Sequence, residues 1–185
     1  MNFIFISPQF PKHYWNFCDR LKKNGVNVLG IGDSPYDALS DELKNALTEY
    51  YYLPHLDDYG EMVKAVGFFT FKYGKIDWIE SNNEFWLAQD ARLRTDFHVT
   101  TGEQYDHIDR IKNKSAMKAY YAKAGVPTAR LHKVTSFEAG RDFAHMVGYP
   151  VIVKPDNGVG ACDTYKLHND DELAYFYATK PQDVP

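Results

Sequence analysis

Short apolar runs alternate with amphipathic segments through residues 1–100, and this alternation limits the fold more than any other feature of the sequence. The apolar runs have the length and composition of buried strands, whereas the segments between them place apolar residues at helical spacing. A repeated strand–helix order predicts a parallel sheet with helices on both of its faces. We therefore expect an α/β fold, with strands at 3–7, 26–32, 50–54 and 76–81.

Polar residues follow the predicted strands at the edge where ligands bind in sheets of this kind. Ser7 and Gln9 come after the first strand, and Asn82, Asn83 and Glu84 come after the fourth. Ligands bind beyond the carboxyl ends of parallel strands, so these five side chains are candidates for binding a small polar substrate. Serine and asparagine also cap helices, and those after the fourth strand could do so for the helix that follows.

The chain lacks the glycine pattern of a dinucleotide site. The sheet is Rossmann-like in layout, but no glycine occurs between the first strand and Gly25. A dinucleotide-binding turn needs glycines at that place, because only glycine lets the backbone reach the pyrophosphate. A dinucleotide-dependent enzyme is therefore disfavoured.

Composition excludes several classes of protein. The formal net charge of the 185 residues is −4, without a long basic tract, so nothing points to nucleic acid as a partner. No apolar run is long enough to cross a membrane. Cys18 and Cys162 fit no disulfide framework, and the histidines and cysteines show no ligand spacing, so we predict no metal site within the chain. We expect a cytoplasmic protein.

The residues after 112 follow a different pattern, which predicts a second and smaller domain of α+β type. We expect a first domain over residues 1–112 and a second over residues 113–185. Asn113 is a suitable cap for a helix that ends near Gly125. The other predicted elements are strands at 129–135, 150–155 and 162–167, a loop at 156–161, and helices at 136–148 and 170–179.

Lys154 ends one of these strands and precedes a glycine loop. Alternation along the strand places Val151 and Val153 on one face and Lys154 on the other. Gly158 and Gly160 relax the backbone limits of the loop, and consecutive amides beside a lysine suit an anion with several oxygens. A β-hairpin with a solvated lysine would have the same spacing, so both interpretations stay open.

Lys114 is the second lysine of interest. It stands at the start of the helix after Asn113, where the partial positive charge of the helix end disfavours a cation. An anionic ligand at this place would reverse that preference. The alternative is a lysine that simply lies at the surface.

Three blocks of the sequence resemble the ATP-grasp superfamily. "NKSAMKAYYAKAGVPTAR" is similar to its linker helix, and "GYPVIVKPDNGVGACDTYKL" to the strand, lysine, glycine loop and returning strand of its first nucleotide-binding subdomain. "IDWIESNNEFWLAQDARLRTDFHVTTG" resembles the end of the preceding domain in biotin carboxylase and the carbamoyl-phosphate synthase large subunit. The resemblance implies a Rossmann-like pre-ATP-grasp domain and then a first ATP-grasp subdomain. It also implies contacts to ATP phosphates from Lys114, Lys154, Asn157, Gly158, Val159 and Gly160.

The activity implied by the resemblance is that of an ATP-dependent ligase. Such an enzyme activates a carboxylate or bicarbonate as an acyl phosphate, which an amine or another nucleophile then attacks. The implied ligands are ATP, magnesium and a small carboxylate-type substrate, and a homodimer is compatible with the resemblance. No catalytic residue is assigned from the sequence.

The second ATP-grasp subdomain, with its magnesium ligands, is expected to lie outside these 185 residues. The acidic stretch at 168–172 reads as a helix start that Asn169 or Asp170 can cap, with a metal role as the alternative. We therefore expect a truncated front half that binds ATP weakly at best and does not turn over alone. The other interpretation is a non-catalytic ligand-binding or assembly module derived from an ATP-grasp protein.

Overall fold

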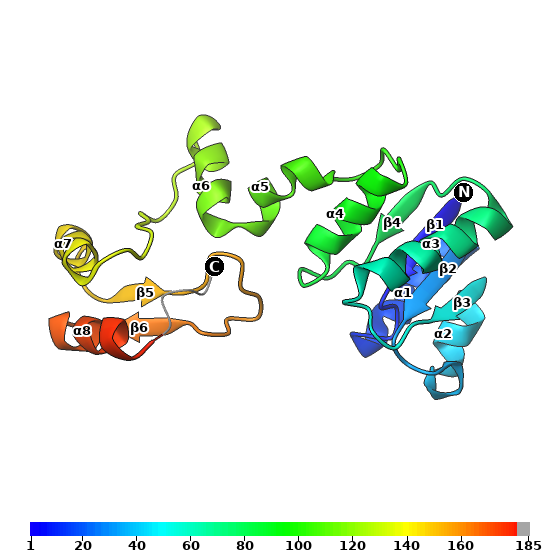
Figure 1. Cartoon of the computed structure of the whole chain (residues 1–185), viewed down its shortest axis with the longest axis horizontal. Helices are drawn as coiled ribbons and strands as arrows, with labels where there is room; N and C mark the ends of the chain where they lie inside the picture. The colour runs from blue at the N-terminus through cyan, green and yellow to red at the C-terminus, as the bar shows by residue number, and fades with distance from the viewer. Residues whose placement is uncertain (181–185) are drawn as a thin grey trace. The chain divides into compact units, whose positions relative to one another are not determined.

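The computed structural model describes residues 1–180, so the last five residues of the predicted second domain lie outside the described range. The chain divides into two compact units (Figure 1). The first unit is Met1–Ile108, and the second begins at Asp109.

A four-stranded parallel sheet forms the centre of the first unit. Its strands lie in the order β3-β2-β1-β4, so the order along the sheet reverses between β1 and β4. All three neighbouring pairs are parallel. The four strands predicted from the apolar runs are present, as β1 (Asn2–Ile6), β2 (Asn27–Gly32), β3 (Glu49–Tyr52) and β4 (Trp78–Glu80).

Alternation along β1 sends its side chains into two separate cores. Phe3 and Phe5 belong to the cluster on the face of α1 and α2, whereas Ile4 and Ile6 belong to the cluster on the face of α3 and α4. Both faces of the sheet are thus buried, which explains why the strands read as continuous apolar runs. The helical elements of this unit are η1 (Lys12–Tyr14), α1 (Trp15–Lys23), η2 (Tyr36–Ala38), α2 (Asp41–Ala46), α3 (Tyr59–Tyr73), α4 (Leu87–Asp96) and η3 (Tyr105–His107).

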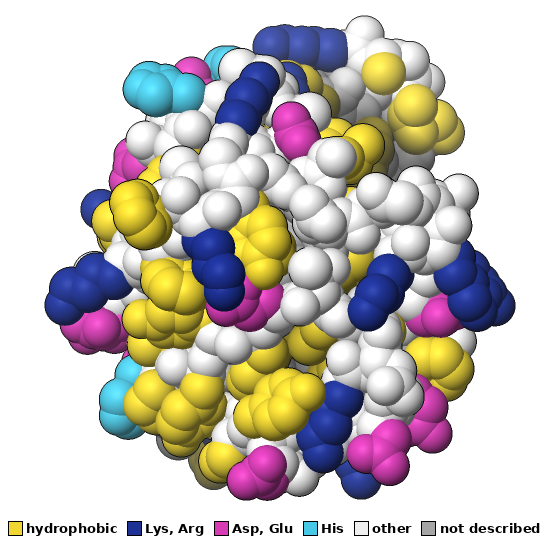
Figure 2. Space-filling view, turned by 90° about the vertical axis from the view of Figure 1, so that its right-hand side faces the viewer, with side chains coloured by type: hydrophobic (Ala, Val, Ile, Leu, Met, Phe, Trp, Pro, Cys, Tyr) yellow, Lys and Arg dark blue, Asp and Glu magenta, His cyan; other side chains and the backbone are white. Residues whose placement is uncertain are grey.

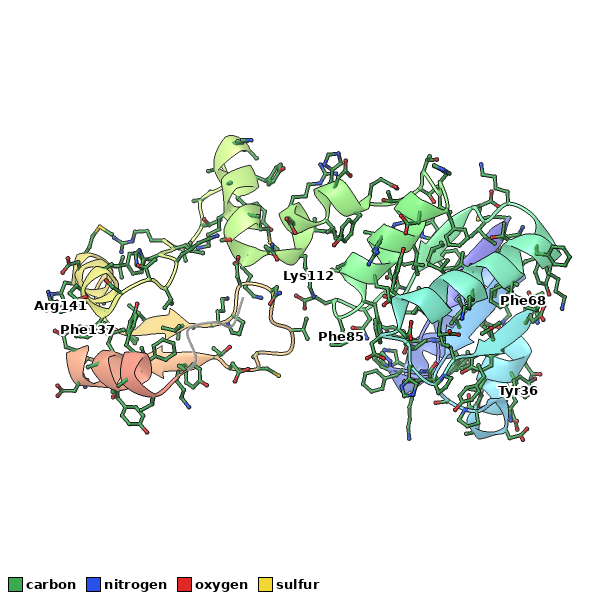
Figure 3. All side chains as sticks on the ribbon, in the orientation of Figure 1. Tyr36, Phe68, Phe85, Lys112, Phe137 and Arg141 are labelled. Carbon is green, nitrogen blue, oxygen red and sulfur yellow. The ribbon has the colours of Figure 1, made fainter. Side chains whose placement is uncertain are left out.

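Part of the aromatic content packs around β3. The ring of Tyr50 lies 6.2 Å from that of Tyr36, and the ring of Tyr51 lies 5.4 Å from that of Phe68. Tyr36 and Phe68 are labelled in Figure 3. The Lys72 ammonium lies 5.7 Å from the centre of the Phe68 ring. Figure 2 shows hydrophobic side chains on one face among charges of both signs.

The second unit contains a two-stranded antiparallel sheet and four helices among the described residues. Its core cluster consists of Ala144, Leu167, Leu173 and Phe176, with partly buried residues of α7, β5 and β6 against it. The elements are α5 (Asp109–Lys112), α6 (Lys114–Lys123), α7 (Phe137–Val147), β5 (Val151–Val153), β6 (Tyr165–Leu167) and α8 (Asp170–Thr179).

Serine or asparagine side chains cap three helix starts among the described residues. The hydroxyl oxygens of Ser40 and Ser136 accept hydrogen bonds from the backbone N–H groups three residues further on. The side chain of Asn169 accepts from the N–H of Glu172, so the acidic stretch at 168–172 is a helix start, as predicted. These bonds satisfy N–H groups that a helix leaves without an internal partner.

The prediction of a strand at 129–135 is wrong. These residues form no ladder with another strand of the described chain, and Leu131 and Val134 are exposed. A strand requires a neighbour to pair its N–H and C=O groups, and an apolar alternation in the sequence does not supply one.

We expect Gly140→Ala to destabilise the second unit. A Cβ at this position would lie 3.0 Å from two ring carbons of Tyr177 on α8, so α7 and α8 would have to separate. The cost expected from overpacking is about 1–3 kcal/mol, which exceeds the gain in helix propensity. In Gly67→Ala, the matched control, the added Cβ meets nothing within 4 Å, so the first unit should gain roughly 0.5–1 kcal/mol. Denaturant unfolding measures both changes, and equal effects at the two glycines would contradict the packing seen at Gly140.

Candidate functional site

The segment after β1 forms a polar cluster with the end of β2. Ser7 has a positive φ of 53°, and its N–H donates to the carbonyl of Ile31 at 2.8 Å. Gln9 Nε2 donates to Asp33 Oδ1 at 2.6 Å and to Ser7 Oγ at 3.2 Å. Gly32 must stay small, because a Cβ there would clash with Gln9 Oε1. The structure therefore brings the predicted residues Ser7 and Gln9 together at the carboxyl end of the sheet.

Gln9 Oε1 is buried and accepts no hydrogen bond within the described part of the chain. A buried acceptor without a donor is costly, since it loses its hydrogen bonds to water and gains none in return. This oxygen is therefore a candidate acceptor for a ligand donor group.

The loop after β4 has a second positive φ, at Asn82. The carbonyl of Asn82 accepts from the Tyr14 hydroxyl at 2.6 Å, which joins this loop to the segment that follows β1. Asn83 Oδ1 accepts from the N–H of Phe85 at 3.0 Å, so this side chain caps the turn before α4. The Asn82 and Glu84 side chains are exposed on the same loop. Of the three predicted residues, Asn83 thus uses its side chain in a structural contact, whereas Asn82 and Glu84 have exposed polar side chains.

A buried polar network binds the backbone of this loop and of the end of β4. Asp90 Oδ2 accepts from the N–H of Ser81 at 3.0 Å and from the Ser81 hydroxyl at 2.6 Å. Arg94 Nη1 donates to the carbonyl of Ile79 at 2.7 Å and lies 3.3 Å from Glu80 Oε2. Asp90 and Arg94 are both almost fully buried, although they are charged residue types. Sequence reasoning missed this network, and its only local signal was an acid and a base four residues apart on a helix.

Burial raises the pKa of Asp90 to about 8, and the nearby Glu80 acts in the same direction. The bonds from Ser81 and the charge of Arg94 oppose this rise. Because burial disfavours the charged form, the folded protein stabilises a proton on this carboxyl group over much of the neutral range.

We expect Asp90→Asn to remove a pH dependence of stability. The ordinary carboxyl pKa is about 4, so between about pH 4 and pH 8 the folded state binds a proton that the unfolded state has released. Protonation of Asp90 in the folded state therefore adds to the free energy of unfolding. This gain is fully present below the unfolded pKa and is lost as the pH rises through the folded pKa. The free energy of unfolding of Asp90→Asn, measured with denaturant relative to wild type, should therefore rise from pH 4 to pH 8. Above pH 8 the difference between the two proteins should stay constant. Asp57→Asn, at an exposed position, is the control. A constant difference between Asp90→Asn and wild type across this range would disprove the assignment.

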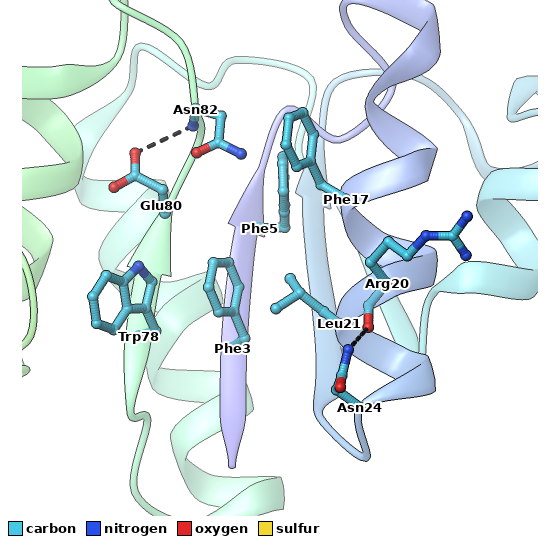
Figure 4. A pocket seen from close by; sticks show the side chains of 9 residues that line it. All are labelled: Phe3, Phe5, Phe17, Arg20, Leu21, Asn24, Trp78, Glu80 and Asn82. Carbon is cyan, nitrogen blue, oxygen red and sulfur yellow. Dashed lines mark hydrogen bonds between the residues drawn. The ribbon is translucent and has the colours of Figure 1, made fainter.

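An apolar hollow of about 400 Å³ lies beside α1 on the face of β1 and β4 (Figure 4). Phe3, Phe5, Phe17 and Trp78 supply its aromatic lining, and Arg20, Leu21, Asn24, Glu80 and Asn82 complete it. The hollow adjoins the loop after β4, because Glu80 Oε1 accepts from the N–H of Asn82 at 3.2 Å.

In the second unit, Lys154 lies where the sequence predicts it. Val151 and Val153 pack against the core cluster, while Ile152 and Lys154 are exposed on the alternate side. The Lys154 ammonium makes no ion pair or hydrogen bond to the residues that the structure describes. It is therefore a cation at the exit of β5, directly before the glycine loop.

Lys114 lies against the same loop. Its Nζ donates to the carbonyl of Gly158 at 2.6 Å and to the carbonyl of Asp156 at 3.2 Å. An ammonium group has three N–H donors, so these two bonds leave one for a further acceptor. The structure thus brings one predicted lysine to the loop that follows the other.

The cap of α6 differs from the prediction. Asn113 occupies the N-cap position, but its side chain makes no capping bond. Asp156 takes this role instead, since its Oδ1 accepts from the N–H of Ser115 at 2.7 Å and its Oδ2 from the Ser115 hydroxyl at 2.6 Å. A carboxylate from the loop, 41 residues away along the chain, therefore lies at this helix end.

The glycine loop presents its backbone to the surroundings. The N–H groups of residues 157–161 donate to no acceptor among the described residues, and Asn157 and Gly160 are exposed. Gly160 has a φ of 65°, and a Cβ on Gly158 would lie 3.0 Å from the Pro155 ring. A run of unpaired amides beside an ammonium group can bind an anion with several oxygens.

Nowhere in residues 1–180 do three or more His, Cys, Asp or Glu side chains come together in a way that could hold a metal ion. None of the helices described is both long and apolar enough to cross a membrane.

Residues 109–182 match the family described as carbamoyl-phosphate synthase L chain, ATP binding domain. Over these residues, the chain belongs to the ATP-grasp superfamily. The match contains two of the three sequence blocks, with both lysines and the glycine loop, and confirms the resemblance to the superfamily for that part of the chain.

Relatives of this ATP-grasp chain include two named ligases or synthases. The L-arginine-specific L-amino acid ligase of Bacillus subtilis is 27% identical over 163 residues, which cover 87% of this chain and 38% of the relative. A carbamoyl phosphate synthase large chain of Clostridium botulinum is 26% identical over 157 residues, which cover 84% of this chain and 14% of the relative. The chain therefore spans well under half the length of these curated relatives.

Solved structures share the fold. The biotin carboxylase domain of the Hydrogenobacter thermophilus 2-oxoglutarate carboxylase matches with a TM-score of 0.75 at 20% identity, covering 95% of this chain and 39% of that one. The L-amino acid ligase from Bacillus licheniformis matches with a TM-score of 0.69 at 16% identity, covering 96% of this chain and 41% of that one. The mixed α/β fold with a parallel sheet is thus one that ATP-grasp proteins have.

Proposed function

We propose that this chain supplies two parts of an ATP-dependent ligase: a pre-ATP-grasp domain over residues 1–112 and a first nucleotide-binding subdomain from residue 113 onwards. The observation that carries the proposal is the Lys114 ammonium, which lies on the carbonyls of Asp156 and Gly158 in the loop that follows Lys154. The printed names of the relatives, an amino acid ligase and carbamoyl phosphate synthases, support the same class of reaction.

In the proposed reaction, an oxygen of a carboxylate or bicarbonate forms a bond to the γ-phosphorus of ATP. The bond from that phosphorus to the bridging oxygen of ADP breaks, and ADP leaves. An amine or another nucleophile then attacks the carbonyl carbon of the acyl phosphate, and inorganic phosphate leaves. Phosphoryl transfer depends mainly on positioning and on neutralising charge, so the protein must supply cations and N–H donors around the phosphates.

The residues of the second unit fit a triphosphate. Lys114 keeps one N–H donor for a phosphate oxygen while it stays bound to the loop, and Lys154 adds a second cation at the exit of β5. The amides of Asn157, Gly158, Val159 and Gly160 can donate to the remaining oxygens. Magnesium, held by residues of a second subdomain in this proposal, would neutralise part of the phosphate charge.

The sheet edge of the first unit would bind the substrate. Ser7, Gln9, Asn82, Asn83 and Glu84 surround this edge, and the unpaired Gln9 Oε1 could accept from a substrate N–H or O–H group. Since the backbone of Asn82 and the side chain of Asn83 already make structural contacts, the side chains of Gln9 and Asn82 would recognise the small carboxylate-type substrate, with the exposed Glu84 on the same loop.

The proposal extends to assembly and location. The Hydrogenobacter biotin carboxylase domain is named as a dimer with ADP, magnesium and bicarbonate, and a homodimer is part of the present proposal. Cys18 and Cys162 are free thiols, which suits a reducing cytoplasm.

We expect Lys114→Ala and Lys154→Ala each to weaken ATP binding by about tenfold or more. A hydrogen bond to a charged group contributes roughly 1.5–3 kcal/mol, and each 1.4 kcal/mol is a factor of ten in affinity. Titration calorimetry with ATP measures the change. Lys133→Ala is the control, because this exposed lysine of the same unit lies outside the loop and α6. If both variants bind ATP as wild type does, the phosphate site is elsewhere and the proposed function loses its support.

A further inference from the structure

We propose that Asp156 is a positioning residue, whose carboxylate holds the start of α6 on the glycine loop and so keeps the Lys114 ammonium at the phosphate site. This inference deepens the proposed function and rests on it for the role of the phosphate site. The contact between Asp156 and α6 can be tested without any nucleotide.

Helix α6 contributes no residue to the core cluster of the second unit. None of its residues is buried, and the described cluster takes its members from α7, β6 and α8. Most helices stay in place because one face packs into a core. Since α6 lacks such a face, polar contacts at its first turn must determine where Lys114 lies.

Those polar contacts converge on Asp156. Its two carboxylate oxygens accept from the N–H and the hydroxyl of Ser115, at 2.7 Å and 2.6 Å. Its main-chain carbonyl accepts from the N–H of Lys114 at 3.0 Å and from the Lys114 ammonium at 3.2 Å. One residue of the loop therefore binds both the backbone and the side chain of the helix start.

The charge of Asp156 suits this place. A carboxylate at a helix N-terminus interacts favourably with the partial positive charge of the helix end. The same position disfavours the cation of Lys114, which is nevertheless required there in the proposed function. The carboxylate offsets this repulsion, so it stabilises the ammonium as well as the helix start.

The alternative is that the Asp156 carboxylate occupies the position of a phosphate group and so blocks nucleotide binding. The hydrogen-bond pattern favours positioning, because Lys114 binds main-chain carbonyls and leaves the carboxylate to Ser115. A competing anion would be expected to bind the ammonium group itself. The two roles predict opposite changes in affinity when the carboxylate is removed.

The test compares Asp156→Ala with Asp156→Asn in the 185-residue chain. Asparagine can still accept from the Ser115 N–H and donate to its hydroxyl, whereas alanine can do neither. Asp163→Asn is the control, because it removes the same charge from the same loop at a residue without a bond to α6. Ser115→Ala should give a smaller change in the same direction as Asp156→Ala.

The first measurement is hydrogen exchange of single amides by NMR. The Lys114 N–H is the reporter, because its acceptor is a main-chain carbonyl that every variant retains. We expect its exchange to accelerate about tenfold or more in Asp156→Ala, and to stay within about threefold of wild type in Asp156→Asn and Asp163→Asn. Unchanged exchange in Asp156→Ala would overturn the proposal, whether or not the chain binds ATP.

The second measurement is ATP affinity. We expect Asp156→Ala to lower it about tenfold, Asp156→Asn to restore most of it, and Asp156→Ala to have no further effect in a Lys114→Ala background. Tighter ATP binding by Asp156→Ala, or independent losses in the double variant, would overturn the positioning role. A wild-type chain that does not bind ATP would instead contradict the proposed function. The exchange measurement would still show whether the Asp156 carboxylate holds the start of α6.

Discussion

Five hydrogen bonds join the first turn of α6 to the turn that follows β5, and the proposed nucleotide site depends on them. They connect Lys114 and Ser115 with Asp156 and Gly158, which lie more than forty residues further along the chain. They fix the first turn of α6 on the loop, since none of the α6 side chains is buried in the core of the second unit. Polar contacts, and not packing in the small apolar core of the second unit, thus hold the residues of the proposed nucleotide site together.

The first unit follows the same principle at the edge of its sheet. Two residues with positive φ, Ser7 and Asn82, turn the chain sharply where β1 and β4 end. The buried pair of Asp90 and Arg94 binds the backbone around the β4 exit and keeps this turn in place. Backbone conformations of this kind persist when the surrounding structure holds them, and they often occur where ligands bind.

Much of the fold could be predicted from the sequence, because its determinants are local. The alternation of Phe3, Ile4, Phe5 and Ile6 is enough to indicate a strand buried on both faces, and Ser136 is enough to indicate a helix start. The errors occurred where a partner is distant in the sequence. The predicted strand at 129–135 has no neighbour to pair with in the described chain, and the cap of α6 comes from Asp156 rather than from Asn113. The network of Asp90 and Ser81 was missed because an acid and a base four residues apart on a helix do not show that either will be buried.

The most direct test of the central claim is a titration of the isotopically labelled chain with magnesium-ATP, followed by two-dimensional NMR of the backbone amides. If Lys114 and the glycine loop form one phosphate site, the amides of Lys114 and of residues 157–161 will show the largest saturable shifts. Saturable binding with the largest shifts at the sheet edge of the first unit, and none in the loop, would contradict the account.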